Sequence, residues 1–161
     1  MTVKEYNNCV DQYADAVYRF IKKNVRDEDK AKDIVQDTFE KIWLRVTDID
    51  AEKSKSYLFT AAYHTMIDAI RREKNQVEMQ EEHEELLTTH NTFSDLKKVI
   101  DRALAKLSEI QRSVIMLRDY EGYSYEEIGE ITGLNESQVK VYIYRARLSM
   151  KEYIVSLENV M

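Results

Sequence analysis

Hydrophobic residues recur at steps of three and four along most of this chain, the spacing that predicts amphipathic α-helices. In the first half, three such stretches predict helices from residue 2 to about residue 24, over 31–46 and over 56–72. Polar segments at 26–30 and 47–55 separate them. Three amphipathic helices of this length can bury a core of their own.

The second half repeats the pattern with clear start signals. Ser94 can cap a helix that runs towards Leu107. A capping side chain then stands three residues before Glu or Gln, a spacing in which each side chain satisfies a free backbone N–H. The pairs are Ser108 with Gln111, Ser124 with Glu127 and Asn135 with Gln138, and Thr2 with Glu5 does the same for the first helix. Gly122 and Gly133 fall in the breaks, where positive φ is cheapest.

The last two helices form a distinct motif. A short helix carries Ile128 and Ile131 on its apolar face, and Leu134 follows in a tight turn. The inner face of the longer helix then continues through Val139, Ile143, Ala146 and Met150. This is the helix-turn-helix pattern, whose second helix enters the DNA major groove.

The outer face of the longer helix suits DNA. Ser137, Val141 and Tyr144 point away from the core, Lys140 and Arg145 flank them, and Arg147 lies nearer the core edge. Residues 135–151 carry a net charge of +3. Small polar and apolar groups for base edges, surrounded by cations for phosphates, are typical of a recognition helix. The alternative is an amphipathic helix whose cations are merely solvated; the capped turn favours DNA.

Composition narrows the fold class to all-α. The chain has no proline and three glycines in 161 residues, and both residues are disfavoured inside helices. No segment approaches the roughly 20 apolar residues of a membrane span, and the N-terminus is too polar for a signal peptide. Cys9 is the single cysteine, which excludes an internal disulfide. We therefore expect a cytoplasmic protein that does not insert into membranes.

The negative charge is concentrated in one segment. Residues 1–72 carry no net charge, 73–93 carry −5 and 94–161 carry −1. We expect two small helical domains, 1–72 and 94–161, on an acidic, solvated linker at 73–93; a short helix near 81–87 is the alternative. Neither domain has the charge for strong autonomous DNA binding, so we expect a partner to hold the chain on nucleic acid.

Catalysis finds no support in the sequence. There is no Gly-rich phosphate loop, nucleophile-elbow motif or HExxH. His64, His83 and His90 lack metal-ligand spacing with each other and with Cys9. We expect no enzymatic activity, no cofactor and no metal.

Two blocks of sequence resemble a known family. DIVQDTFEKIW (33–43) and YLFTAAYHTMIDAIRR (57–72) look like region 2 of bacterial sigma-70 factors, and residues 107–154 look like their region 4. The order and spacing are similar to the extracytoplasmic-function (ECF) group, which keeps only these two regions. The resemblance implies a subunit that binds core RNA polymerase, through the clamp helices of the beta-prime subunit and the beta flap. It also implies binding to promoter DNA and control by an anti-sigma factor.

The resemblance assigns three sets of residues. The expected polymerase contacts are Asp33, Gln36, Asp37, Glu40 and Trp43. Recognition and opening of the −10 promoter element map to Lys53, Lys55, Tyr57, Phe59, Tyr63, His64, Arg71 and Arg72. The −35 element should meet Asn135, Ser137, Gln138, Lys140, Val141, Tyr144, Arg145 and Arg147. Aromatic groups for unstacked bases and cations for phosphates suit the second set.

Several of these residues could instead have a purely structural role. Trp43 and each aromatic residue of the −10 set could serve as core residues. Two other functions also stay open: an autonomous helix-turn-helix regulator, and a helical adaptor that binds only proteins. The chain departs from the family pattern at Ala62, Tyr63 and His64, where many relatives have Ala-Arg-Asn, and at Gly129, where a small Ala is common.

Overall fold

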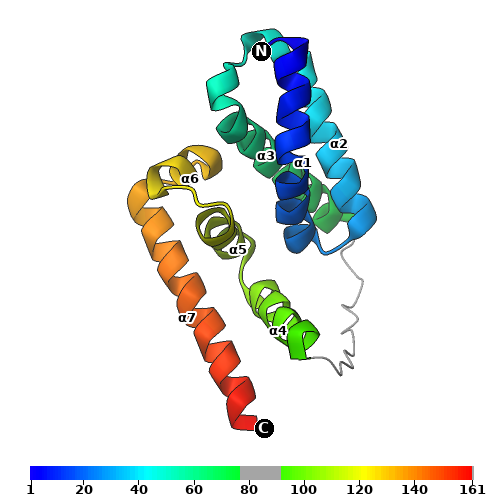
Figure 1. Ribbon diagram of the computed structural model, residues 1–161. Helices are drawn as coiled ribbons and strands as arrows, with labels where there is room; N and C mark the ends of the chain where they lie inside the picture. Colours follow the sequence, from blue (N-terminus) through cyan, green and yellow to red (C-terminus); the bar gives the residue numbers. More distant parts are fainter. Residues whose placement is uncertain (77–91, 161) are drawn as a thin grey trace.

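The first three helices form an N-terminal bundle (Figure 1). The computed structural model describes residues 1–76 and 92–160. Helix α1 spans Val3–Val25, α2 spans Glu28–Leu44 and α3 spans Ser54–Gln76. Two short 3₁₀ turns, η1 (Val46–Asp48) and η2 (Ala51–Lys53), connect α2 to α3.

The remaining helices form a C-terminal bundle (α4–α7). Helix α4 spans Thr92–Lys106, and α5 spans Glu109–Ile115 and continues as a π-helical turn, η3 (Met116–Tyr120). Helix α6 spans Tyr125–Thr132 and α7 spans Glu136–Val160. Figure 1 shows the long α7 running past α4, α5 and α6. Every regular element in the described ranges is helical, so the all-α prediction is confirmed.

The predicted capping boxes are all present. Thr2 with Glu5, Ser108 with Gln111, and Ser124 with Glu127 each bond in both directions. In the fourth box, the Gln138 backbone N–H donates to Asn135 Oδ1 at 2.8 Å and the Asn135 N–H donates to Gln138 Oε1 at 3.0 Å. These bonds fix where α1, α5, α6 and α7 begin, because each satisfies backbone donors that have no partner inside the helix.

Several predicted boundaries were wrong. Helix α2 begins at Glu28, because Asp27 accepts a hydrogen bond from the Lys30 N–H at 3.2 Å and Arg26 ends α1 in a left-handed conformation. Helix α3 continues to Gln76 through polar residues with good helix propensity, so 73–76 do not belong to a linker. Helix α4 begins at Thr92, two residues before Ser94, at which the sequence predicted its cap. The expected linker and the alternative helix near 81–87 otherwise lie outside the described residues.

The two bundles pack against each other. Helix α3 lies against α6, and α1 lies against α4 and α5. At their contact the Phe59 ring meets the Tyr123 ring edge-on, with centroids 5.5 Å apart, and Phe59 also packs edge-on against Phe20. All three aromatic side chains are buried. We call this packing of the N-terminal on the C-terminal bundle the closed arrangement.

The turn between α6 and α7 depends on Gly133. Its φ is +81°, and its N–H donates to the Gly129 carbonyl at 2.8 Å. A Cβ at Gly129 itself would stand 2.7 Å from the Leu134 carbonyl oxygen, so the backbone of the turn approaches α6 too closely there for any side chain. Because the left-handed region is strained for residues with a side chain, Gly133→Ala should lower the free energy of unfolding by about 1 to 2 kcal/mol. Denaturant unfolding would measure this, and Gly133→Asn should lose less, since Asn tolerates that region.

Candidate functional site

The outer face of α7 is free of contacts with the core. The inner-face residues Val139, Ile143 and Ala146 are buried, as predicted. All eight residues of the −35 set are exposed: Asn135, Ser137, Gln138, Lys140, Val141, Tyr144, Arg145 and Arg147. Val141 and Tyr144 expose 44% and 68% of their surface, one turn apart on the same face, so their side chains are available for contact. This face has the shape and chemistry to enter a major groove.

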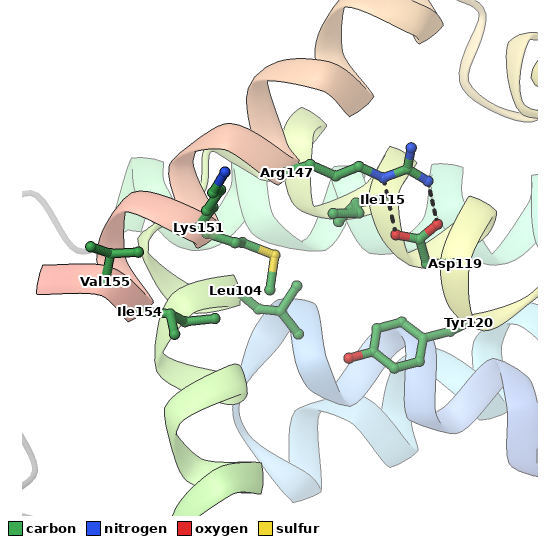
Figure 2. A pocket seen from close by; sticks show the side chains of 9 residues that line it. Leu104, Ile115, Asp119, Tyr120, Arg147, Lys151, Ile154 and Val155 are labelled. Atoms are coloured by element: carbon green, nitrogen blue, oxygen red, sulfur yellow. Dashed lines mark hydrogen bonds and ion pairs between the residues drawn. The ribbon is translucent and has the colours of Figure 1, made fainter. Parts of the chain in front are cut away.

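The cations on α7 differ in their freedom. Within the described residues, Arg145 makes no hydrogen bond or ion pair, while Lys140 lies 3.3 Å from Glu136 and 5.6 Å from the centre of the Tyr125 ring. Arg147 is tied to Asp119 by two hydrogen bonds of 2.6 and 3.4 Å, which raise the pKa of its guanidinium (Figure 2). Arg145 is therefore better placed than Arg147 to hold a phosphate.

Arg147 borders an apolar groove beneath α7. Figure 2 shows side chains from α4, α5 and α7 around it. The groove holds about 380 Å³. Its apolar members include Leu104, Met150, Ile154 and Val155. No described residue fills it, so this part of the C-terminal bundle offers an apolar surface on the side of α7 that carries Arg147.

The eight residues of the −10 set lie on two faces of the N-terminal bundle. Tyr57, His64 and Arg71 share one exposed face of α3, since they are spaced by about two turns, and Lys53 and Arg72 are also exposed. Phe59 and Tyr63 are buried, and burial raises the pKa of Tyr63. Lys55 is half-buried at the bundle contact, 4.8 Å from the centre of the Tyr123 ring.

The structure adds two cations to the exposed face that the sequence did not single out. Lys41 and Arg45, at the end of α2, line a hollow of about 410 Å³ together with Tyr57 and Ala61. The Lys41 ammonium also donates to the Thr65 hydroxyl at 3.1 Å. Their spacing of four residues at the helix end was a signal, but it is also typical of cations that complement a helix C-terminus.

The expected polymerase-binding residues form one exposed face of α2. Asp33, Gln36, Asp37, Glu40 and Trp43 are all exposed. Trp43 exposes 45% of its surface and packs one side on Tyr6, with ring centroids 5.0 Å apart, so it is not a core residue. Leu44, which the apolar stripe did not include, is 82% exposed beside it. The acidic face of α2 thus ends in two exposed apolar side chains, Trp43 and Leu44, a composition that is compatible with a protein interface.

A polar latch holds the closed arrangement. Asn24, which is buried at the end of α1, donates to the Phe20 carbonyl at 2.8 Å, which turns its Oδ1 towards α5. That oxygen accepts a hydrogen bond from Arg112 Nε at 3.0 Å. The Arg112 guanidinium also donates to the Leu104 and Leu107 carbonyls at 3.4 Å, and burial lowers its pKa. The negative end of the α4 dipole therefore stabilises a cation that has no carboxylate partner among the described residues.

Two further features of the described residues concern metals and membranes. No group of three or more His, Cys, Asp and Glu side chains there is arranged to hold a metal ion. None of the helices there is both long and apolar enough to cross a membrane.

Comparison with known proteins identifies the family. Residues 9–76 match the family described as Sigma-70 region 2, and residues 97–150 match Sigma-70, region 4. The RNA polymerase sigma factor YlaC of Bacillus subtilis is 32% identical over 152 residues, which cover 88% of this chain and 87% of YlaC. The ECF RNA polymerase sigma factor SigM of the same organism is 26% identical, and the alignment covers 94% of each chain.

Solved structures agree with the closed arrangement. The sigma factor RpoE of Bartonella quintana, bound to the anti-sigma factor NepR, superposes with a TM-score of 0.81 and 27% identity over 94% of this chain and 98% of RpoE. The match spans both helical bundles in one superposition. The chain thus belongs to the sigma-70 family as a member of its ECF group, a promoter-directing RNA polymerase sigma factor rather than an autonomous regulator.

Proposed function

We propose a division of labour among the three exposed faces. The face of α2 that ends in Trp43 and Leu44 docks on the clamp helices of core polymerase. Tyr57, His64 and the cations around them meet the −10 element, and the outer face of α7 meets the −35 element. The observation that carries this proposal is the exposure of all eight −35 residues, seven on α7 and Asn135 at its cap, in a capped helix-turn-helix.

The closed arrangement has to open for this division to work. Two promoter elements two helical turns apart are separated by about 70 Å, whereas here α3 packs directly on α6. Phe59 and Tyr63 are buried in the closed arrangement, where Phe59 packs on Tyr123 of the other bundle, so neither ring is open to the −10 element in this state. We propose that each bundle is one domain, as the charge distribution indicates, and that polymerase binding separates the two domains.

The apolar groove of Figure 2 supports a second polymerase contact. Its side chains Leu104, Met150, Ile154 and Val155 suit an apolar segment such as the tip of the beta flap. The groove opens beside Arg147 rather than on the face of Tyr144. A protein bound there would therefore leave the −35 face of α7 free.

An anti-sigma factor is the expected antagonist. The similarity to RpoE, whose structure was determined with NepR bound, supports such a partner for this chain. A partner that holds the closed arrangement would prevent the separation that promoter binding needs. We place this non-enzymatic activity in the cytoplasm, where core polymerase meets the chromosome.

In vitro transcription tests the proposal. Core polymerase from a related bacterium should yield promoter-specific transcripts only when this chain is added. The chain alone should bind promoter duplex weakly, because its domains lack the charge for autonomous binding. Transcription that does not depend on the added chain would refute the assignment of this chain as the specificity subunit.

Two arginine variants test the reading of α7. Arg145→Ala should weaken promoter binding by holoenzyme about tenfold, because a phosphate contact is lost. The magnitude of the slope of the logarithm of the binding constant against the logarithm of the salt concentration should fall by about one. Arg147→Ala should weaken promoter binding less, since the Arg147 guanidinium is already hydrogen-bonded to Asp119. Filter binding of holoenzyme at several salt concentrations measures both. An adaptor that binds only protein predicts that neither variant, nor Lys140→Ala, alters transcription.

A further inference from the structure

A basic cleft of about 450 Å³ lies between α1 and α4. Arg19, Lys22 and Lys23 of α1 line it, and so does Arg26, the residue that ends α1. Lys97, Lys98 and Arg102 line it from α4. Asp101 is the single acidic side chain among the described residues that line it, while Glu28 and Glu121 lie near enough to Lys22 and Arg19, respectively, to interact with them electrostatically. Because the whole chain carries a net charge of −6, this concentration of cations is not a general property of its surface.

Ion pairs and helix-dipole interactions account for the positions of only a few of these cations. Lys23 pairs with Asp101 at 2.9 Å across the two bundles, and Lys22 and Lys23 complement the C-terminal end of α1. The other cations that line the cleft have no ion-pair partner within the described residues. Lys97 and Lys98 lie in the N-terminal half of α4, where the dipole does not favour them. Closure thus brings two rows of like charge face to face.

We propose that this cleft binds a short linear chain of phosphate groups. Arg guanidinium groups bind phosphate through two parallel hydrogen bonds, and Lys supplies compact charge. Tyr18 and Leu104 add an apolar surface beside the cations. The shared chemistry of the ligand is linked phosphates, either as an inorganic polyphosphate or as the tail of a nucleotide.

The size of the cleft argues against an acidic peptide helix. A helix is 10–12 Å across and rises 5.4 Å per turn, so a single turn fills about 500 Å³. The cleft therefore holds no more than about one turn. A small ligand of high charge density fits this volume, since small-molecule sites are typically about 300 to 1,000 Å³.

The ligand would be selective for the closed arrangement. Its site needs cations from α1 and from α4, and the proposed function, on which this step rests, separates those helices at the promoter. A ligand that bridges both walls replaces their mutual repulsion with attraction and opposes opening. The cleft thus couples the presence of a phosphate-rich metabolite to the availability of the sigma factor.

Calorimetric titration of the full chain with sodium tripolyphosphate, in metal-free buffer at physiological salt, tests the site. Saturable binding with one ligand per chain is expected. Lys97→Gln with Lys98→Gln should weaken it at least tenfold, and Arg19→Gln with Lys22→Gln on the other wall should do the same. Lys4→Gln with Lys106→Gln removes the same charge outside the cleft and should change the affinity less than twofold. Circular dichroism verifies that each variant is folded.

Further titrations separate the sources of the ligand. ATP without magnesium should bind at least as tightly as tripolyphosphate; a tenfold preference for ATP indicates a nucleotide and equal binding indicates an inorganic chain. If all three double variants lost the same affinity for tripolyphosphate, the proposal would be overturned. Such a result would show that the ligand responds to the overall charge of the chain rather than to the cations of the cleft. The proposal would also be overturned if a short DNA duplex bound more tightly than tripolyphosphate and lost affinity in the same cleft variants. That result would show that the cleft is a nucleic-acid-binding surface.

Amide hydrogen exchange then tests the coupling to closure. Tripolyphosphate should slow exchange in α5 and α6, at the bundle contact, in the wild-type chain and not in the Lys97→Gln, Lys98→Gln variant. Exchange that stays unchanged while the ligand binds would refute selectivity for the closed arrangement. No polymerase or promoter enters these measurements, so they stand or fall independently of the initiation assay.

Discussion

Leu44→Lys is expected to weaken association with core polymerase by about 30-fold or more, because an interface hot spot is worth at least about 2 kcal/mol. Leu44 is 82% exposed beside Trp43, at the end of a face that carries Asp33, Asp37 and Glu40. An acidic face predicts a basic partner, so a lysine there loses apolar contact and adds repulsion. Fluorescence anisotropy of the labelled chain, titrated with core polymerase, measures the affinity.

Folding should be unaffected by this change. An exposed substitution at a helix C-terminus shifts the free energy of unfolding by less than about 0.5 kcal/mol. Leu96→Lys makes the same chemical change at another exposed leucine, on α4, and should leave polymerase affinity unchanged. Equal affinities for the two variants would exclude the end of α2 as the polymerase contact. Trp43→Ala is a less specific test of the polymerase contact, because it also removes the packing of Trp43 on Tyr6.

Local sequence signals predicted the C-terminal bundle well. A capping box joins residues three apart, so Ser124 with Glu127 could be recognised without any tertiary information. The inner face of α7 was predictable for the same reason, since Val139, Ile143 and Ala146 repeat with the helical period. The outer face then followed by elimination.

The boundary errors came from tertiary and cap information that periodicity lacks. The second helix was expected to begin at residue 31 because its first apolar residue is Ala31, but the cap at Asp27 starts it earlier. Periodicity also ended α3 at Arg72, although Glu73 and the residues after it continue the helix without apolar side chains. Polar helical turns leave no hydrophobic pattern to detect.

The contact between the bundles was beyond sequence reasoning. Phe59 and Tyr123 are far apart in the chain, and no local pattern indicates that their rings meet. The aromatic residues of α3 could therefore be assigned neither to the core nor to DNA. The structure divides them, since Tyr57 faces solvent, Phe59 packs on Tyr123 of the second bundle and Tyr63 is buried. Leu44 was missed because a search for core stripes passes over apolar residues outside the stripe.

Asn24→Ala should shift the free chain towards an open form and strengthen its binding to core polymerase. In the closed arrangement Asn24 Oδ1 is the acceptor that the N-terminal bundle offers to the half-buried Arg112 guanidinium. Its loss leaves the Nε–H of Arg112 without an acceptor, although the rest of the guanidinium still donates to the Leu104 and Leu107 carbonyls; an unsatisfied buried donor costs about 1 to 3 kcal/mol. Water satisfies Arg112 once the bundles separate, so the cost falls on the closed form alone. The closed-to-open ratio should therefore fall by about 5- to 150-fold.

Small-angle scattering and polymerase titration together measure this shift. The radius of gyration of the free chain should rise, and polymerase affinity should rise with it, because less free energy is spent on opening. Asn8→Ala removes an exposed asparagine from the same helix and should change neither quantity. A compact Asn24→Ala chain with unchanged affinity would show that the contact between Phe59 and Tyr123, rather than the Asn24–Arg112 latch, limits opening. In that case the packing of Phe59 on Tyr123, together with the Lys23–Asp101 pair, sets how much of the sigma factor is available to polymerase.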